Sequence, residues 1–181
     1  LTPEVLAEFY RSHYNASNCF AILCGDFGED IEERVVAILE GLPEGNRDAT
    51  LIPPASPVPF ASMKMENTVQ SSIKIGLPLF PRTHPDFIPM QILATALGGY
   101  FGSRLMQNLR ERNGFTYGVF SAMVNFQKAG YLAIATQVGV EVTDEALRQI
   151  AAEIERLREE LVPNEELQLV KNIMAGEMMR I

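Results

Sequence analysis

The sequence predicts an α+β fold, a mixed and largely antiparallel sheet of about four strands with helices packed on one face. Three observations lead to this prediction. Apolar residues recur at helical spacing in about six segments, and shorter segments are continuously apolar or alternate between apolar and polar residues. Two of the strand-like segments are also joined by a short turn sequence, as in a β-hairpin.

Residues 1–42 predict a helix, a strand and a second helix. Thr2-Pro3-Glu4 is typical of a helix start, because a hydroxyl cap precedes proline at the first helical position. The apolar run from Cys19 to Cys24 predicts a buried strand. Its two cysteines would be buried free thiols on opposite faces, ~16 Å apart and unable to pair. Asp30 opens the second helix, whose inward residues are expected to be Ile31, Val35, Ile38, Leu39 and Leu42.

Residues 43–61 are predicted to be a linker or a loop that crosses the surface. Pro53-Pro54, Pro57 and Pro59 cannot supply a regular hydrogen-bond ladder, since proline has no backbone N–H. This segment is therefore the best candidate for a boundary between two parts of the chain.

Residues 62–181 predict a strand, two helices, a hairpin and two further helices. The strand runs from Thr68 to Leu77, and the two helices from Pro85 to Leu97 and from Ser103 to Arg112. The first of these helices is apolar nearly all round and is therefore expected to be buried. The hairpin consists of Phe115 to Phe126 and Tyr131 to Val140 joined by residues 127–130, and the last two helices begin at Thr143 and Pro163. The inward residues of the last two helices are expected to be Leu147, Ile150, Ala151, Ile154, Leu157 and Leu161, then Leu167, Val170 and Met174.

Composition and charge exclude several classes of function. The net charge is −8 and the basic residues form no concentrated patch, which argues against binding nucleic acid. No apolar run reaches the ~18 residues of a membrane span, and no signal peptide is present. We expect a soluble protein, and both a cytoplasmic and a periplasmic location stay open.

The most informative segment runs from Ala96 to Tyr117 and contains the pattern G-G-x-x-x-S-R-L-x-x-x-L-R-E-x-x-G-x-x-Y. This pattern resembles the C-terminal half-domain of the pitrilysin/insulinase family of zinc peptidases, which includes the mitochondrial processing peptidases. In that family the segment lies across the active-site chamber from the zinc, and its second arginine and its tyrosine help bind the scissile peptide. The resemblance therefore implies that Arg110 and Tyr117 bind substrate.

The chemistry of these two side chains suits that role. Arginine is always charged and presents a planar fork of donors, while tyrosine keeps its proton at neutral pH. Together they can hydrogen-bond a substrate carbonyl or a developing oxyanion. The alternative interpretation is structural: Arg110 is a surface charge favoured by a helix C-terminus, and Tyr117 packs as an ordinary strand residue.

The family's zinc motif, H-x-x-E-H, is absent from the sequence. The two histidines, His13 and His84, are far apart and fit neither this motif nor its inverse, so packing or capping is the favoured role for each. The resemblance implies that zinc is held by a partner domain or subunit, and that this chain alone is inactive.

The resemblance covers nearly the whole chain and implies how it is organised. Residues 1–42 resemble the helix-strand-helix tail that closes one family repeat, and residues 62–181 resemble the head of the next repeat, truncated at its C-terminal end. We therefore expect a piece of a longer chain. The strand Cys19–Cys24 would complete a sheet with the later strands or pair between chains, which makes a homodimer through an exposed strand edge possible.

Three functional hypotheses follow. The first is the non-zinc, substrate-binding portion of a metalloendopeptidase that hydrolyses peptides together with a zinc-bearing domain or subunit. The second is a catalytically silent scaffold homologue with a structural or assembly role. The third is an unrelated α+β ligand-binding module, which applies if the match between Gly98 and Tyr117 is chance.

Overall fold

The structure is a computed structural model that describes residues 1–28, 30–47, 60–126 and 128–180. The chain divides into two compact units, Leu1–Ser56 and Pro57–Ile181, and each is described by itself. Most of the predicted linker 43–61 lies outside the described residues. The assignment of residues 1–42 and 62–181 to successive family repeats stays a prediction.

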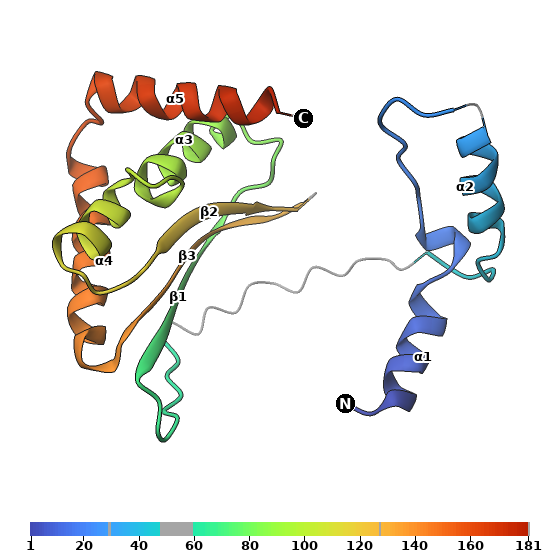
Figure 1. Ribbon diagram of the computed structural model, residues 1–181, viewed down its shortest axis with the longest axis horizontal. Coiled ribbons are helices and arrows are strands. Elements are labelled where there is room, and N and C mark those ends of the chain that lie inside the picture. Colours follow the sequence, from blue (N-terminus) through green and yellow to red (C-terminus); the bar gives the residue numbers. More distant parts are fainter. Residues whose placement is uncertain (29, 48–59, 127, 181) are drawn as a thin grey trace. The chain divides into compact units, whose positions relative to one another are not determined.

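The second unit contains a three-stranded antiparallel sheet (Figure 1). Its strands are β1 (Gln70–Leu79), β2 (Val119–Asn125) and β3 (Gly130–Gly139), and their order is β1-β3-β2. The predicted hairpin is confirmed, because β2 pairs with β3 along its whole length, although Gln127 of its turn lies outside the described residues. Within the described part of the chain the sheet has three strands and is purely antiparallel, where the sequence predicted about four strands and a mixed sheet.

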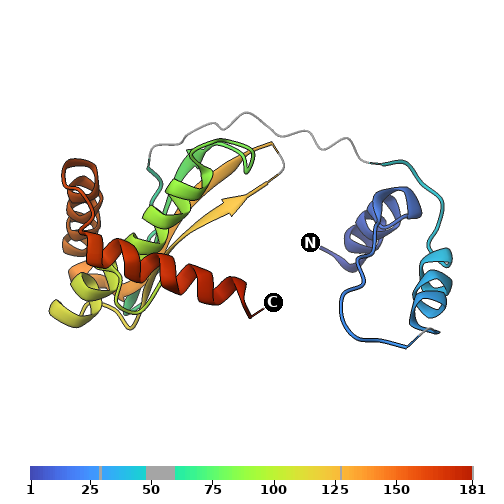
Figure 2. The ribbon, with the colours of Figure 1, turned by 90° about the horizontal axis from the view of Figure 1, so that it is seen from above.

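Helices cover one face of this sheet, as predicted (Figure 1). They are α3 (Phe87–Gly98), the π-helix η2 (Met106–Arg112), α4 (Thr143–Glu159) and α5 (Asn164–Met178), with a short 3₁₀ turn, η3 (Val140–Val142), before α4. Along β3 the buried residues alternate with less buried ones, which is the pattern of a strand covered on one face. Figure 2 shows the same helices from above, with α5 packed on α3.

The core of this unit joins the sheet to the helices. Ile134 on β3, Leu109 on η2 and Ile150 on α4 are almost completely buried and belong to one hydrophobic cluster. Burying a side chain of this size contributes about 1.5–3 kcal/mol relative to leaving it exposed. These contacts hold η2 against the sheet, and η2 carries the central part of the sequence motif.

Three predictions of burial in this unit are wrong. In α3 the apolar side chains of Ile88 and Leu93 are exposed, although the sequence pattern predicted a helix buried all round. Ala151 is exposed on α4, and Leu161 is 95% exposed because α4 ends at Glu159, before that position. Ile88, Leu93 and Ala151 are exposed because each helix of this unit has only one face against the sheet or a neighbouring helix.

The first unit contains α1 (Pro3–His13), the 3₁₀ turn η1 (Ala16–Asn18) and α2 (Asp30–Glu40). The predicted cap is confirmed, since the Thr2 hydroxyl accepts a hydrogen bond from the Val5 backbone N–H at 3.5 Å. In α2 no residue is fully buried, and Ile38 is 73% exposed instead of facing inward. The other four predicted inward residues of α2 and its end are half-buried.

The predicted buried strand from Cys19 to Cys24 is wrong in two respects. The segment forms no strand, and both cysteines are exposed free thiols. Phe20 and Ile22 are also about four-fifths exposed (83% and 80%). A strand needs a neighbour to pair with its backbone N–H and C=O groups, and no described strand pairs with this segment.

Candidate functional site

The motif begins where α3 touches the sheet. A Cβ added to Gly98 would lie 2.6 Å from the backbone nitrogen of Ser121 on β2, so glycine lets this helix approach the strand closely. The structure shows that Gly98 serves contact between a helix and a strand.

Arg104 forms an ion pair that ties the motif to α5. Its Nε and Nη2 donate to the two carboxylate oxygens of Glu166 at 2.8 and 2.9 Å, and the two side chains are only 13% and 22% exposed. These hydrogen bonds raise the pKa of Arg104 above its ordinary value. Burial raises the pKa of the neighbouring Tyr100 phenol, and the Glu166 carboxylate raises it further. Arg104 therefore makes a structural contact through two of its three guanidinium nitrogens.

Arg110 lies in η2, where the sequence predicted a short helix. This helix is of the π type, whose short segments are frequent at functional sites. The Arg110 guanidinium lies over the ring of Phe101, 4.7 Å from its centroid, and its Nε is 3.4 Å from the Glu111 carboxylate. The side chain is 37% exposed. The aromatic ring thus supports the guanidinium from one side while part of it faces solvent.

A buried polar network connects η2 to the turn that follows it. The Asn108 side-chain amide donates to the carboxylate of Glu153 at 2.7 Å and lies 3.1 Å from the Gln149 side-chain oxygen. The Asn113 amide donates to the Asn108 backbone carbonyl at 2.9 Å and to its side-chain oxygen at 2.8 Å. Glu153 is only 3% exposed. A buried carboxylate requires hydrogen-bond partners, so Glu153 holds the Asn108 side chain in place. Asn108 in turn holds Asn113, the first residue after η2, and the network thus fixes the start of the turn that leads to β2.

Tyr117 lies in the turn between η2 and β2. The sequence predicted that it lies on the strand, and this placement is wrong, because β2 begins only at Val119. Gly114 has a φ of +64°, which lets the chain reverse, and the Phe115 backbone N–H donates to the Leu109 carbonyl at 2.8 Å. The Tyr117 side chain is 91% exposed. It makes no hydrogen bond within the described residues, so the alternative that it packs as a core strand residue is wrong.

Hydrogen bonds nevertheless hold the residues on both sides of Tyr117, Thr116 through its side chain and Gly118 through its backbone. The Gly118 N–H donates to the Thr116 hydroxyl at 3.1 Å. The Thr136 hydroxyl on β3 lies 3.0 Å from the Thr116 hydroxyl and 2.9 Å from the Gly118 carbonyl. The structure thus presents a large, exposed phenol on an anchored turn, and Arg110 lies in η2, the helix that precedes this turn. No hydrogen bond joins the two side chains among the described residues.

The described residues do not suit a zinc site. Nowhere in residues 1–28, 30–47, 60–126 and 128–180 do three His, Cys, Asp or Glu side chains gather to hold a metal ion. His84 accepts a hydrogen bond from the Asp86 backbone N–H at 3.2 Å and stacks on Phe80. His13 stacks on the ring of Phe9. Both contacts agree with the packing or capping roles that the sequence favoured.

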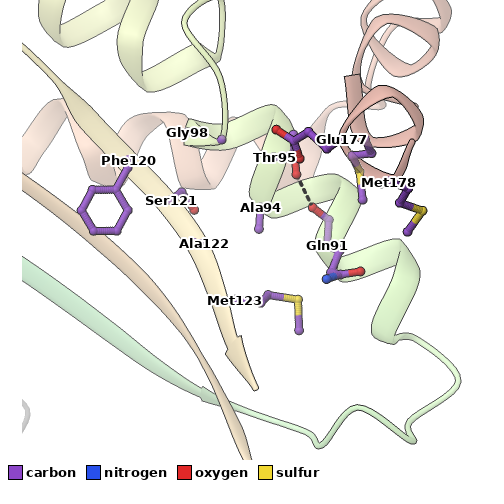
Figure 3. Close-up of a pocket in the computed structure, with 12 residues that line it drawn as sticks. Gln91, Ala94, Thr95, Gly98, Phe120, Ser121, Ala122, Met123, Glu177 and Met178 are labelled. Carbon is purple, nitrogen blue, oxygen red and sulfur yellow. Dashed lines mark hydrogen bonds between the residues drawn. The ribbon is translucent and has the colours of Figure 1, made fainter. Parts of the chain in front are cut away.

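A cavity of about 450 Å³ lies beside β2 and was not predicted from the sequence. Three elements form it (Figure 3). β2 contributes Ser121 and Met123, α3 contributes Gln91 and Ala94, and α5 contributes Glu177 and Met178. These elements are distant in sequence, and α5 carries no pattern that points to β2. Only the packing of α5 on α3 creates the cavity.

None of the described helices is both long and apolar enough to cross a membrane. This finding agrees with the sequence, which contains no apolar run of that length.

Comparisons with known proteins show the family that the motif indicated. The family model of the "Peptidase M16 inactive domain" matches residues 1–174. An "Uncharacterized zinc protease" of Streptomyces coelicolor is 26% identical over 180 residues, covering 92% of this chain and 38% of the relative. A second protein named as an uncharacterized zinc protease, from Rickettsia felis, is 25% identical over 182 residues, covering 97% of this chain and 44% of the relative. The chain thus spans about two fifths of these relatives' length.

A solved structure of the same family is similar to this chain. The crystal structure of a peptidase M16 inactive domain from Pseudomonas fluorescens is similar with a TM-score of 0.76 and 27% identity, over 99% of this chain and 44% of that chain. A protease from Helicobacter pylori shares the fold, with a TM-score of 0.75 over 99% of this chain and 45% of that chain, at 19% identity. With a family match over nearly its whole length and an exposed Tyr117 at the end of the matching motif, this chain belongs to the peptidase M16 inactive-domain family.

Proposed function

We propose that this chain is the non-zinc, substrate-binding portion of a zinc metalloendopeptidase, and that it acts on peptides with a zinc-bearing domain or subunit. One observation carries the proposal. Tyr117 is 91% exposed, yet hydrogen bonds hold the side chain of its neighbour Thr116 and the backbone of its neighbour Gly118. An exposed aromatic side chain on a rigid turn contributes nothing to the core of this unit, and it is well suited to contact a ligand.

The proposed mechanism uses hydrogen bonding and charge only. The Tyr117 hydroxyl donates to a substrate carbonyl, and the Arg110 guanidinium holds negative charge that develops on that oxygen. Phe101 supports the guanidinium by a cation–π contact, which limits its motion before substrate binds. A zinc ion held by the partner lobe would supply the activated water, and the proposal assigns no described residue of this chain to binding it.

The test uses the complete zinc-bearing assembly. Arg110→Ala and Tyr117→Phe are each expected to lower kcat/KM for a fluorogenic peptide by ~10²–10³, the usual loss for one donor to a developing oxyanion. Arg112→Ala and Tyr131→Phe are matched controls that change the same residue types outside the proposed site. Circular dichroism and zinc content must stay at the wild-type level.

Unchanged turnover in Arg110→Ala and Tyr117→Phe would contradict the proposal. Hydrolysis would then depend on other residues, and the chain would fit the scaffold hypothesis better. The same conclusion follows if the wild-type assembly binds zinc and does not hydrolyse peptides.

A further inference from the structure

Asn113-Gly114 is the one Asn-Gly pair in the sequence, and both residues are exposed. An asparagine side chain loses its amide when the backbone nitrogen of the next residue attacks it. Glycine hinders this attack least, because it has no Cβ. A Cβ built on Gly114 would meet no described atom within 4 Å, so the pair is also open to solvent on that side. The pair therefore has the covalent chemistry of a deamidation site.

The reaction at this pair needs only water as a co-reactant. The Gly114 nitrogen forms a bond with Cγ of the Asn113 side chain, and the bond from Cγ to the amide nitrogen breaks. The proton of the Gly114 N–H leaves with that nitrogen as ammonia, and a succinimide ring remains. Water then adds to one of the two ring carbonyls and opens the ring, which gives aspartate or isoaspartate at position 113.

The folded structure holds the pair away from this reaction. The Asn113 side-chain amide donates to the Asn108 backbone carbonyl at 2.9 Å and to the Asn108 side-chain oxygen at 2.8 Å. The Gly114 N–H donates to the Arg110 carbonyl at 3.1 Å, so the attacking nitrogen is also engaged. Ring closure needs that nitrogen beside the Asn113 Cβ, and the helical ψ of −20° at Asn113 does not place it there. The pair can react only after this turn opens.

A buried carboxylate anchors the residue that restrains Asn113. Asn108 is only 7% exposed and donates to Glu153 at 2.7 Å, and Glu153 also pairs with Arg156 at 3.4 Å. Glu153 lies on α4, so the anchor belongs to a different element from the turn that it holds. Opening the turn exposes polar groups that are satisfied in the folded state, which makes the open state rare.

We propose that Asn113 is a latent deamidation site that Asn108 keeps closed, and that its reaction irreversibly displaces the turn that carries Tyr117. The aspartate product has no amide to donate, and its charge faces the two oxygens of Asn108 that accept from Asn113. Isoaspartate also places the Cβ of residue 113 in the main chain, which lengthens the turn. The inference rests on the proposed function in taking Tyr117, four residues later, to bind substrate.

The first experiment follows the reaction itself and needs no turnover. The complete assembly is incubated at neutral pH and digested, and mass spectrometry separates the asparagine, aspartate and isoaspartate forms of the peptide that contains Asn113. We expect the reaction to be more than about ten-fold faster in the urea-unfolded chain than in the folded one, because three hydrogen bonds are released together. Asn172 is the internal control and should react far more slowly in urea, because the branched side chain of Ile173 hinders attack.

Asn108→Ala tests whether Asn108 keeps the site closed. It removes one acceptor of the Asn113 amide and the anchor to Glu153, so the folded protein should deamidate about five-fold faster. Glu153→Gln weakens the anchor while keeping its size, and it replaces Asn108→Ala if that variant does not fold. Gly114→Ala adds a Cβ beside the attacking nitrogen and should slow the reaction in urea. Equal rates in the folded and unfolded wild type, or no acceleration in the folded variants, would overturn the inference.

The two proposals can fail separately. Asn113→Asp reproduces one product and is expected to lower kcat/KM for the fluorogenic peptide at unchanged zinc content. If deamidation follows the expected rates and Tyr117→Phe keeps full turnover, the proposed function fails and the deamidation site stands. If Tyr117→Phe loses turnover and Asn113→Asp keeps it, the proposed function stands and the effect of deamidation on the turn is rejected.

Discussion

Replacing Asn108 tests whether the buried network holds the turn that carries Tyr117. Asn108→Ala removes a 2.7 Å hydrogen bond to the buried carboxylate of Glu153, and hydrogen bonds to charged groups contribute about 1.5–3 kcal/mol. It also removes the 2.8 Å bond from Asn113, worth about 1 kcal/mol, while Asn113 keeps its bond to the backbone carbonyl. We therefore expect the free energy of unfolding to fall by about 2.5–4 kcal/mol.

A second substitution at this position makes the effect depend on pH. Asn108→Asp places two carboxyl groups within hydrogen-bond distance in a buried site, which raises the pKa of the pair in the folded state. A raised folded-state pKa gives stability that is present below the unfolded values of about 3.9–4.3 and is lost as pH rises. Asn108→Asp should thus be closer in stability to the wild type at pH 4 than at pH 7.

The assay is urea unfolding followed by far-ultraviolet circular dichroism, since the chain contains no tryptophan. Asn172→Ala, an exposed asparagine of α5, is the matched control and should change the free energy of unfolding by less than about 0.5 kcal/mol. A loss below about 1 kcal/mol in Asn108→Ala would refute the reasoning. So would a loss of stability in Asn108→Asp that is the same at pH 4 and pH 7.

Three further predictions concern the contacts around the motif. Arg104→Ala leaves the largely buried carboxylate of Glu166 unpaired and should lower the free energy of unfolding in urea by about 2 kcal/mol, less than the loss of a fully buried ion pair. Arg104→Lys should restore only part of this free energy, because lysine cannot form the two parallel hydrogen bonds. Gly98→Ala places a Cβ 2.6 Å from the Ser121 nitrogen, so α3 must move from β2 and the melting temperature should fall, by an amount equivalent to about 1–3 kcal/mol. The pKa of Tyr100 is raised in the folded state, so its contribution to the free energy of unfolding is complete below pH 10 and is lost as the pH rises further. Tyr100→Phe should therefore reduce the fall of the free energy of unfolding above pH 10. An unchanged fall in this variant would contradict the raised pKa of Tyr100.

The helices and the hairpin could be predicted because their signals are local. Residues such as Ile150 and Ile154 recur at the spacing of one helix face, and the four residues 127–130 can only join neighbouring strands. Predictions failed where the outcome depends on a neighbour. Cys19 to Cys24 is as apolar as a core strand, yet it forms none in the described structure, because strand formation requires a second strand to pair with.

In the candidate site, too, the residues of the local motif could be predicted and the contacts between distant residues could not. The motif located Arg110 and Tyr117, but it could not show that Tyr117 precedes the strand and is exposed while Arg104 is held by Glu166, 62 residues later in the chain. Nor could the sequence show the cavity, whose walls come from three elements.

By itself the sequence therefore determined the family, the order of most elements and the two residues proposed to bind substrate, since these depend on local spacing and on a contiguous motif. Only the tertiary structure decided which side chains are buried, which arginine pairs with Glu166 and which three elements enclose the cavity. Those outcomes depend on contacts between residues far apart in the chain, and no local pattern encodes which surfaces meet.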